Sequence, residues 1–441
     1  MKKSIYIFHR DFRIYDNHTL KKATNESDIV YPIFIMTPEQ INNNKYFSSR
    51  SASFMAGCLL DLATYISLCI FSGHTIDVLT KLIKQHNITG IYHNKDVSPF
   101  AKQREIDIEK LCKQLNLSYY GGSDIFLHHS INLFNAKKKP YLKFTPFYNF
   151  AKSKIRINIV KLTPNELAKI KAISRDQQLS LLKKLQVPII YKCTRTEALN
   201  RINNYPQNYL KTRDTPSIPT TQISAYLHYG IISPQETYDK LSTVLQRQLI
   251  WREFYLYISA YLHICYSKKS HTLSSRNIKW KNNKEHFKKW CSGKTGIPWV
   301  DAGMRELNAT GFMHNRLRMN VAIFLIFYLQ IDWRWGEKYF AQNLIDYDYA
   351  QNLGNWLWCA SWESFANPYF RIFSMEQQMR RFDSNADYVK KWIPELIDIP
   401  AKDLYNWPVS YDKYKIKYPK PIITDLSQVR QNGIKLFSKK T

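Results

Sequence analysis

The hydrophobic positions in the first 128 residues form short apolar runs, separated by segments in which apolar side chains recur with a helical period. Such runs are typical of buried strands, and four of them lie at 4–8, 30–36, 66–73 and 88–94. Helical spacing occurs in 75–87 and 101–116. Because alternating strands and helices build parallel sheets, the pattern predicts an α/β domain with a doubly wound, Rossmann-like parallel sheet over residues 1–128.

The hydrophobic pattern changes after residue 128. Residues 129–194 are basic, aromatic and interrupted by prolines, which is typical of a long linker that wraps a surface. From residue 195 the helical period continues almost to the end, so residues 195–441 are predicted to form a larger, all-helical domain. Two domains also suit a chain of 441 residues, which is too long for one ordinary hydrophobic core.

Glycine and cysteine spacings exclude several common sites. No GxGxxG sequence occurs, and the GKT triplet at Gly293–Thr295 lacks the required glycine five residues earlier, where Lys288 stands. The seven cysteines contain no CxxC pair, so we expect a reducing compartment, no disulfide framework and no metal site. We also expect neither a secretion signal nor a membrane span, since the longest apolar stretch, 55–71, is short and interrupted by Asp61.

The charge of the chain is strongly positive. The 64 Lys and Arg residues outnumber the 35 Asp and Glu residues and give a formal charge of +29 at pH 7. Such a surplus suits a polyanionic partner, nucleic acid first and an anionic membrane surface second. A basic host proteome is the alternative explanation, because the chain is also rich in Asn and Ile, and the charge alone does not decide between the two.

All 11 tryptophans lie within residues 251–441, the predicted helical domain. The first belongs to a stripe spaced i, i+3, i+4 and i+7 on one helix face, formed by Gln248, Trp251, Arg252 and Tyr255. This stripe would make a wall for a flat polar ligand, although spacing alone favours a helix–helix contact. Trp356 and Trp358 fall on nearly opposite helix faces, which leaves core packing, base stacking and electron relay open.

A second polar helix face contains Asn315, Arg318 and Met319. Burying Arg318 without a partner would be costly, so it needs a carboxylate, and Asp346 and Asp348 offer two. Paired charges inside a cavity with aromatic planes nearby suit a large, flat, hydrogen-bonding cofactor such as a flavin.

Several ordered segments resemble the photolyase/cryptochrome family over nearly the full length of the chain. The start, FHRDFRIYDNHTL at 8–20, is similar to the family's N-terminal signature. WREFY at 251–255 and three longer segments resemble its flavin-domain signatures, and those segments are 293–319, 331–361 and 367–383. The chain looks most like a class I-type cyclobutane pyrimidine dimer photolyase. The resemblance implies an α/β antenna domain and a helical domain that binds FAD.

The resemblance also implies how FAD is held. Arg318 would pair with Asp346 beside the isoalloxazine ring. Asp348 would bond the ring, and Asn352 would face its N5 atom. The implied cofactor-binding residues are Tyr209, Thr220, Thr221, Gln222, Ile223, Ser224, Arg252, Asn315, Arg318, Asp346, Asp348 and Asn352.

The implied substrate is a UV-made pyrimidine dimer in DNA, which must leave the duplex to reach a buried flavin. By resemblance, excited FADH⁻ donates an electron, the cyclobutane ring splits, and the electron returns. A relay of Trp356, Trp333 and Trp280 would reduce oxidised flavin in light. The implied substrate and DNA contacts are Gln248, Trp251, Asn315, Arg316, Met319, Trp358 and Arg371.

Two departures from the family pattern, Gln248 and Leu245, stand out, and Gln248 bears on which lesion is repaired. Gln248 stands where cyclobutane-dimer enzymes usually have glutamate, a feature shared with (6-4) photolyases. Asn315 and Met319 stand where (6-4) enzymes have histidines, so we predict cyclobutane-dimer repair with (6-4) repair as the alternative. Leu245 replaces a tryptophan often found near the flavin, a change we expect to be tolerated.

Two further alternatives do not involve repair. A cryptochrome-type blue-light photoreceptor is less well supported, because such receptors have Asp or Cys at the position of Asn352. A helical DNA-binding protein without flavin would give a colourless preparation.

The resemblance also raises an antenna chromophore, either methenyltetrahydrofolate or 8-hydroxy-5-deazaflavin. Segment 93–105 lies where antenna contacts are often found, but the sequence does not choose between the two pigments and an empty site. We expect a monomer without membrane partners, cytoplasmic and nucleoid-associated in a bacterium, nuclear or organellar in a eukaryote.

Overall fold

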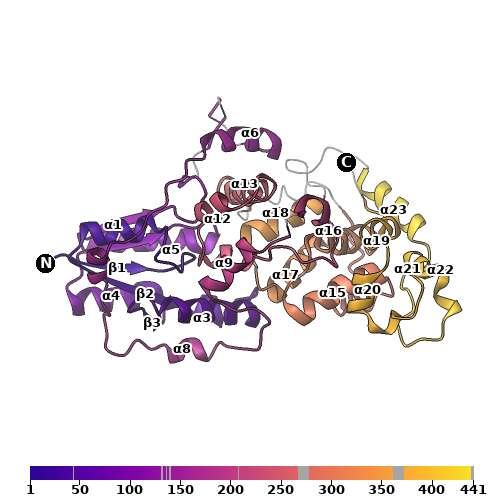
Figure 1. Cartoon of the computed structure of the whole chain (residues 1–441), viewed down its shortest axis with the longest axis horizontal. Coiled ribbons are helices and arrows are strands. Elements are labelled where there is room, and N and C mark those ends of the chain that lie inside the picture. The colour runs from indigo at the N-terminus through magenta and orange to yellow at the C-terminus, as the bar shows by residue number, and fades with distance from the viewer. Residues whose placement is uncertain are drawn as a thin grey trace. The chain divides into compact units, whose positions relative to one another are not determined.

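The computed structural model describes the chain except for residues 43, 131–132, 136, 139–140, 207, 267–277, 361–371 and 439–441. The chain folds into two compact units, each assembled from separate stretches of sequence (Figure 1). The first unit comprises Met1–Tyr205, Thr221–His263 and Ile345–Gln351. The second unit comprises Pro206–Thr220, Ile264–Leu344 and Asn352–Thr441.

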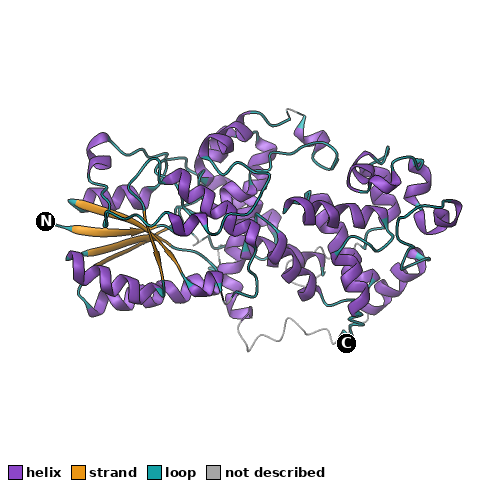
Figure 2. Cartoon of the chain, turned by 90° about the horizontal axis from the view of Figure 1, so that it is seen from below, coloured by secondary structure: helices purple, strands orange, loops and turns teal. Residues whose placement is uncertain are grey.

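The first unit contains a five-stranded parallel sheet in the order β3-β2-β1-β4-β5. Its strands are drawn in orange in Figure 2. The strands are β1 (Lys3–Ile7), β2 (Ile29–Met36), β3 (Cys69–Ser72), β4 (Gly90–Asn94) and β5 (Ser118–Gly122). The predicted doubly wound sheet is therefore confirmed. The fifth strand was not predicted, because its sequence SYYGG has no aliphatic run and it lies at an edge with alternating exposure.

Helices cover the sheet, namely α1 (His18–Glu26), α3 (Ser49–Leu62), α4 (Thr75–His86) and α5 (Pro99–Gln114). Aliphatic side chains of the strands pack with Leu79, Ile83 and Ile108 of α4 and α5 in one core. Helix α5 begins earlier than the apolar spacing predicted, because Ser98 accepts a hydrogen bond from the Ala101 N–H and Pro occupies the first helical turn.

The predicted linker contains helices that its irregular composition concealed. These are α6 (Phe144–Lys154), α7 (Pro164–Ala168) and α8 (Ser180–Lys183). Helix α7 is set by a capping box in which Thr163 and Glu166 satisfy each other's backbone N–H groups. The segment after α7 pairs with β2, since the Val30 N–H donates to Lys169 and the Lys171 N–H donates to Val30.

From residue 195 the described elements are helical, as predicted. They are α9 (Arg195–Asn203), α10 (Tyr209–Thr212), α11 (Ser224–Tyr229), α12 (Pro234–Lys240), α13 (Thr243–Tyr266), α14 (Lys284–Cys291), α15 (Pro298–Thr310), α16 (Asn315–Ile323), α17 (Trp333–Asn343), α18 (Tyr349–Cys359), α19 (Met375–Phe382), α20 (Asp387–Trp392), α21 (Ala401–Tyr405), α22 (Trp407–Ser410) and α23 (Leu426–Ser438). Helix α16 continues into a π-helical turn, η2 (Phe324–Tyr328). In the second unit Trp290, Trp299 and Trp407 are fully buried, so these three tryptophans are core residues. Within the described residues, no helix is long and apolar enough to cross a bilayer.

Candidate functional site

In the first unit, the carboxylate of Asp348 is the centre of a buried charge network. Arg10 binds it directly, His228 Nδ1 lies 3.3 Å from its Oδ2, and the Gln351 N–H donates to its Oδ1 at 3.0 Å. Arg10 also bonds Asp96 at 2.9 Å. Burial would raise the pKa of Asp348, but Arg10 and His228 outweigh burial and hold it well below its ordinary value. Asp348 is therefore a fixed, ionised hydrogen-bond acceptor at neutral pH.

Asp346 and Ser224 form a second arrangement in the first unit. The Ser224 hydroxyl, at the start of α11, donates to Asp346 Oδ2 at 2.6 Å, and Asp346 is buried. The structure thus brings together two residues that the resemblance assigns to the cofactor, although they are far apart in sequence. The preceding residues include Gln222, which has a left-handed backbone and accepts from Arg201 at 3.0 Å. Thr220, Thr221 and Ile223 complete this stretch before α11.

Asn352 lies in α18, within the second unit. Its amide nitrogen donates to the backbone oxygen of Glu337 at 3.1 Å and to Glu337 Oε1 at 2.9 Å, and both residues are buried. Glu337, on α17, therefore fixes the orientation of the Asn352 amide. Sequence analysis missed Glu337, because nothing in its local pattern links it to a residue on the following helix.

The polar face predicted on α16 is present. The Asn315 amide nitrogen lies 3.8 Å from Met319 Sδ, and Arg318 Nε donates to the Met313 backbone oxygen at 2.8 Å. Arg316 points to another side of the helix, where it bonds Asp214 at 2.6 Å and lies 4.3 Å from the Phe382 ring centroid. The Arg318–Asp346 pair and the placement of Tyr209, on α10, against the cofactor stay predictions.

The aromatic stripe predicted on α13 forms in the first unit. The Trp251 ring is stacked on Phe144 of α6, with centroids 3.5 Å apart and planes 6° from parallel, and it also packs on Tyr255. Sequence analysis did not identify Phe144, since it lies in the presumed linker. Arg252 donates to the Ile125 backbone oxygen at 3.0 Å, and Gln248 on the same helix is half-buried.

Trp356 is packed inside the second unit. Its ring meets Phe340 edge-on at 5.1 Å and Trp290 at 6.5 Å. Gly336 makes room for it, because a Cβ at that position would lie 2.2 Å from Trp356 Cη2. Trp333 is also buried, with the Arg334 guanidinium 5.0 Å from its ring centroid.

The other predicted electron-transfer and DNA residues are less defined. Trp280 and Trp358 are half-buried, so neither is a core tryptophan. The electron relay and the lesion-stacking roles stay predictions. Arg371 lies outside the described residues.

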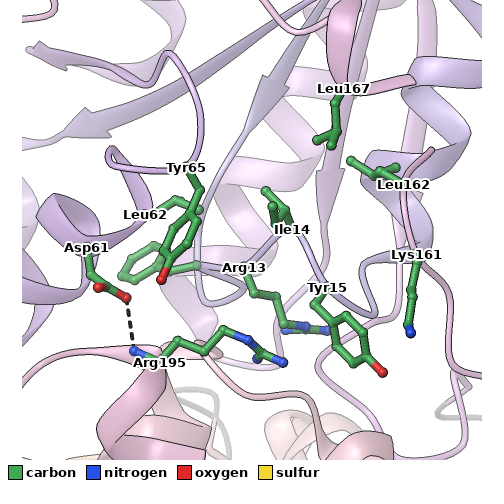
Figure 3. Close-up of a pocket in the computed structure, with 11 residues that line it drawn as sticks. Arg13, Ile14, Tyr15, Asp61, Leu62, Tyr65, Lys161, Leu162, Leu167 and Arg195 are labelled. Atoms are coloured by element: carbon green, nitrogen blue, oxygen red, sulfur yellow. Dashed lines mark hydrogen bonds between the residues drawn. The ribbon is translucent and has the colours of Figure 1, made fainter. Parts of the chain in front are cut away.

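A cavity of about 290 Å³ lies in the first unit, away from these predicted residues (Figure 3). Tyr15 stands on its wall with the Arg195 guanidinium 4.9 Å and Lys161 Nζ 5.6 Å from its ring centroid. The Arg195 backbone N–H donates to Asp61 at 2.9 Å, and its guanidinium is held by Glu236. None of the residues that line this cavity belongs to the predicted FAD or DNA set.

Comparisons with known proteins cover the whole chain. Residues 4–167 match the family model of DNA photolyase, and residues 244–439 match that of the FAD binding domain of DNA photolyase. A deoxyribodipyrimidine photo-lyase of Buchnera aphidicola is 32% identical over 99% of this chain and 97% of its own length. The enzyme of that name from Escherichia coli is 29% identical over 94% of each chain.

Solved structures agree with the sequence relatives. An archaeal photolyase from Sulfolobus tokodaii with two FAD molecules has a TM-score of 0.84 at 32% identity, covering 99% of each chain. A cryptochrome of Synechocystis has a TM-score of 0.86 at 25% identity, covering 99% of both chains. With a parallel sheet, a helical domain and matches along its whole length, the chain belongs to the DNA photolyase family.

Proposed function

We propose that this protein is a deoxyribodipyrimidine photo-lyase, which uses light to split cyclobutane pyrimidine dimers in DNA. The single observation that carries the proposal is the full-length match to enzymes of that name. Buried acceptors at Asp346 and Asp348 and a fixed amide at Asn352 support the proposal.

The residues fit an FAD cofactor. When bound, FAD supplies the photoexcited electron donor, which no amino-acid side chain can replace. The ionised carboxylate of Asp348 suits an N–H group of a flavin ring, and Arg10 and His228 prevent it from turning away. Ser224 fixes Asp346 in the same way. Glu337 uses the amide nitrogen of Asn352 and so fixes how its carbonyl oxygen is presented.

We further propose that Trp251 stacks on the extruded lesion. Because Phe144 covers one face of the indole, the lesion would use the opposite face, and Phe144 would support the ring from behind. Gln248, one turn before Trp251, can both donate and accept hydrogen bonds and so suits the carbonyl and N–H edges of a pyrimidine. Arg316, Trp358 and Arg371 complete the proposed DNA contacts.

The decisive experiment separates the two lesion types. The purified full-length protein, with its flavin reduced, is illuminated with blue light in the presence of an oligonucleotide that carries one cyclobutane dimer. A second sample receives a (6-4) photoproduct in the same sequence, and each sample has a dark control. We expect intact pyrimidines only in the illuminated dimer sample. Repair of only the (6-4) substrate would show that the enzyme is a (6-4) photolyase. Repair of neither substrate would favour a photoreceptor.

A second chromophore would act as an antenna. The S. tokodaii relative holds two FAD molecules, so a second flavin joins the folate and the deazaflavin as candidates. The absorption spectrum of the purified protein identifies this pigment, and extraction shows how many pigment molecules are present for each FAD.

We propose that the protein acts as a monomer in the compartment that holds the host DNA. Sedimentation of its complex with damaged DNA tests the monomeric state.

A further inference from the structure

Three potential metal ligands converge in the first unit, outside the residues predicted for FAD or DNA. His18 begins α1, whereas Asp124 and His129 lie in the loop that follows β5. One potential ligand atom from each residue lies within 4.8 Å of the other two. The two imidazole rings meet edge-on with their centroids 4.4 Å apart.

Asp124 is a buried carboxylate whose two oxygens have different partners. Its Oδ2 accepts hydrogen bonds from the N–H of Thr19 at 2.8 Å and from the Thr19 hydroxyl at 2.6 Å. Its Oδ1 faces His129 Nδ1 at 3.3 Å. Burial would raise the pKa of Asp124, but the bond from His129, the charge of Arg13 and the Thr19 bonds lower it far below its ordinary value. Asp124 therefore offers a negative oxygen anchored from behind by Thr19.

The two histidines offer one ring nitrogen each to a shared ion. His18 Nε2 lies 2.8 Å from the backbone oxygen of Asn158, so it carries the proton and leaves Nδ1 with a free lone pair. His129 Nδ1 and Asp124 Oδ1 face each other at 3.3 Å, so an ion bound by this carboxylate oxygen would be bound by His129 through Nδ1, with the ring proton on Nε2. Metal-ligating histidines characteristically donate their other N–H to a carboxylate or a backbone carbonyl. His18 shows this arrangement, with the Asn158 carbonyl as the acceptor.

The backbone of His129 supports a functional reading of the loop. Its φ of +48° is in the left-handed region, which costs free energy for a non-glycine residue. Strained backbone is concentrated at binding and active sites, and an ion held by His129 would account for it here.

We propose that His18, Asp124 and His129 bind one divalent transition-metal ion, zinc in the first instance. Two imidazoles and one carboxylate form a donor set that zinc prefers, and three protein ligands leave one position for water. The ion would join the start of α1 to the loop after β5 and so fix a stretch that leads into the linker. The cysteine spacings gave no sign of this site, because its ligands are two histidines and an aspartate, with His18 more than 100 residues before the other two.

Zinc titration of the full-length, flavin-loaded protein tests the proposal. After removal of metal with a chelator and dialysis, calorimetry should show one high-affinity equivalent of Zn²⁺ per chain, with Mg²⁺ producing none. His18→Ala and His129→Ala should each weaken this binding at least about tenfold, since loss of outer-shell partners alone costs 10- to 100-fold. His74→Ala is the matched control, because His74 forms an exposed pair with Glu39 at 2.8 Å in the same unit.

Two outcomes would overturn the proposal: wild-type protein that takes up no zinc, or histidine variants that bind it as the wild type does. Circular dichroism and flavin content check that each variant is folded. If His129→Ala does not fold, the test rests on the melting temperatures of the wild type and of His74→Ala. Bound zinc must raise both melting temperatures by the same amount. Repair activity is measured separately, so failure here leaves the proposed function untouched.

Discussion

At the scale of single residues, the buried pair of Arg10 and Asp348 fixes a carboxylate for which we propose a role in cofactor binding. The side chain of Arg10 is 12% exposed and that of Asp348 is 5% exposed. A buried ion pair contributes little net stability compared with apolar residues of similar size. Removing one partner is costly, because the other charge is then buried without compensation. The network therefore fixes the position of Asp348 more than it strengthens the fold.

Replacing Arg10 by Gln should lower the free energy of unfolding by about 3–5 kcal/mol, because Asp348 then keeps a buried charge without its main partner. Urea denaturation measures the loss. Arg380→Gln is the control, since Arg380 pairs with Glu376 on an exposed helix surface and should cost no more than about 0.5 kcal/mol. Equal losses in the two variants would contradict the structural role given to Arg10.

His314 makes a pH-dependent contribution. Burial, opposed by Asp214 and assisted by Arg316 and Arg318, lowers the pKa of His314 to about 4. Because the folded state binds the proton less readily than the unfolded state, stability from this group is complete above pH ~6.5 and declines as the pH falls towards 4, by about 1.4 kcal/mol per pH unit. His314→Asn keeps a side-chain acceptor for the Arg316 N–H. In the His314→Asn variant, the unfolding free energy should no longer fall by this amount per pH unit. If the variant and the wild type show the same slope between pH 6.5 and 4, His314 is not the group responsible.

At the scale of secondary-structure elements, close packing decides which positions tolerate change. Helices α17 and α18 meet where Gly336 faces the indole of Trp356, and the nearest Leu325 atom would be 2.5 Å from an added Cβ. Both neighbours are buried, so neither can move into solvent.

Gly336→Ala should therefore destabilise the protein by about 1–3 kcal/mol and displace Trp356, despite the better helix propensity of alanine. Thermal unfolding and tryptophan fluorescence measure both effects. Gly303→Ala, in α15, is the control, because its Cβ would meet Leu317 at 3.1 Å and need only a small shift. A Gly336→Ala protein as stable as Gly303→Ala would show that the indole is free to move.

The contact between α6 and α13 belongs to the same scale. Trp251→Ala should weaken binding of dimer-containing DNA by about 1–3 kcal/mol, the value of one base–aromatic stack. Phe144→Ala should cost less, because the proposed role of Phe144 is support. Fluorescence anisotropy with damaged and undamaged duplexes measures both. If Trp251→Ala weakens binding to undamaged DNA by the same factor, Trp251 does not stack on the lesion.

Sequence patterns predicted the elements better than their contacts. Apolar runs located four of five strands, and the fifth escaped because SYYGG lacks aliphatic side chains. Helical spacing placed Trp251, Asn315 and Trp356 on helices. Glu337 and Phe144 could not be foreseen, since their roles come from tertiary contacts that leave no local periodicity.

At the scale of the whole molecule, the charge of +29 should dominate binding to undamaged DNA. Each phosphate neutralised by Lys or Arg releases counterions, so affinity should fall about 10³- to 10⁵-fold between 50 and 200 mM salt if 6–10 phosphates are contacted. The ratio of damaged to undamaged affinity should change far less, because stacking does not depend on counterions. Binding assays across this salt range test the prediction, and a salt-independent affinity for undamaged DNA would assign the charge to another partner.

The first unit also has a consequence for synthesis of the chain. It closes only when residues 345–351 join the segments 1–205 and 221–263, and Arg10 bonds a residue 338 positions later in the chain. At 5–20 residues per second, a ribosome needs roughly 7–30 seconds to pass from residue 205 to residue 351. During that interval the nascent sheet carries an Arg10 without its Asp348 partner, so chaperones have their longest opportunity to bind before the two carboxylates proposed for the flavin have been translated.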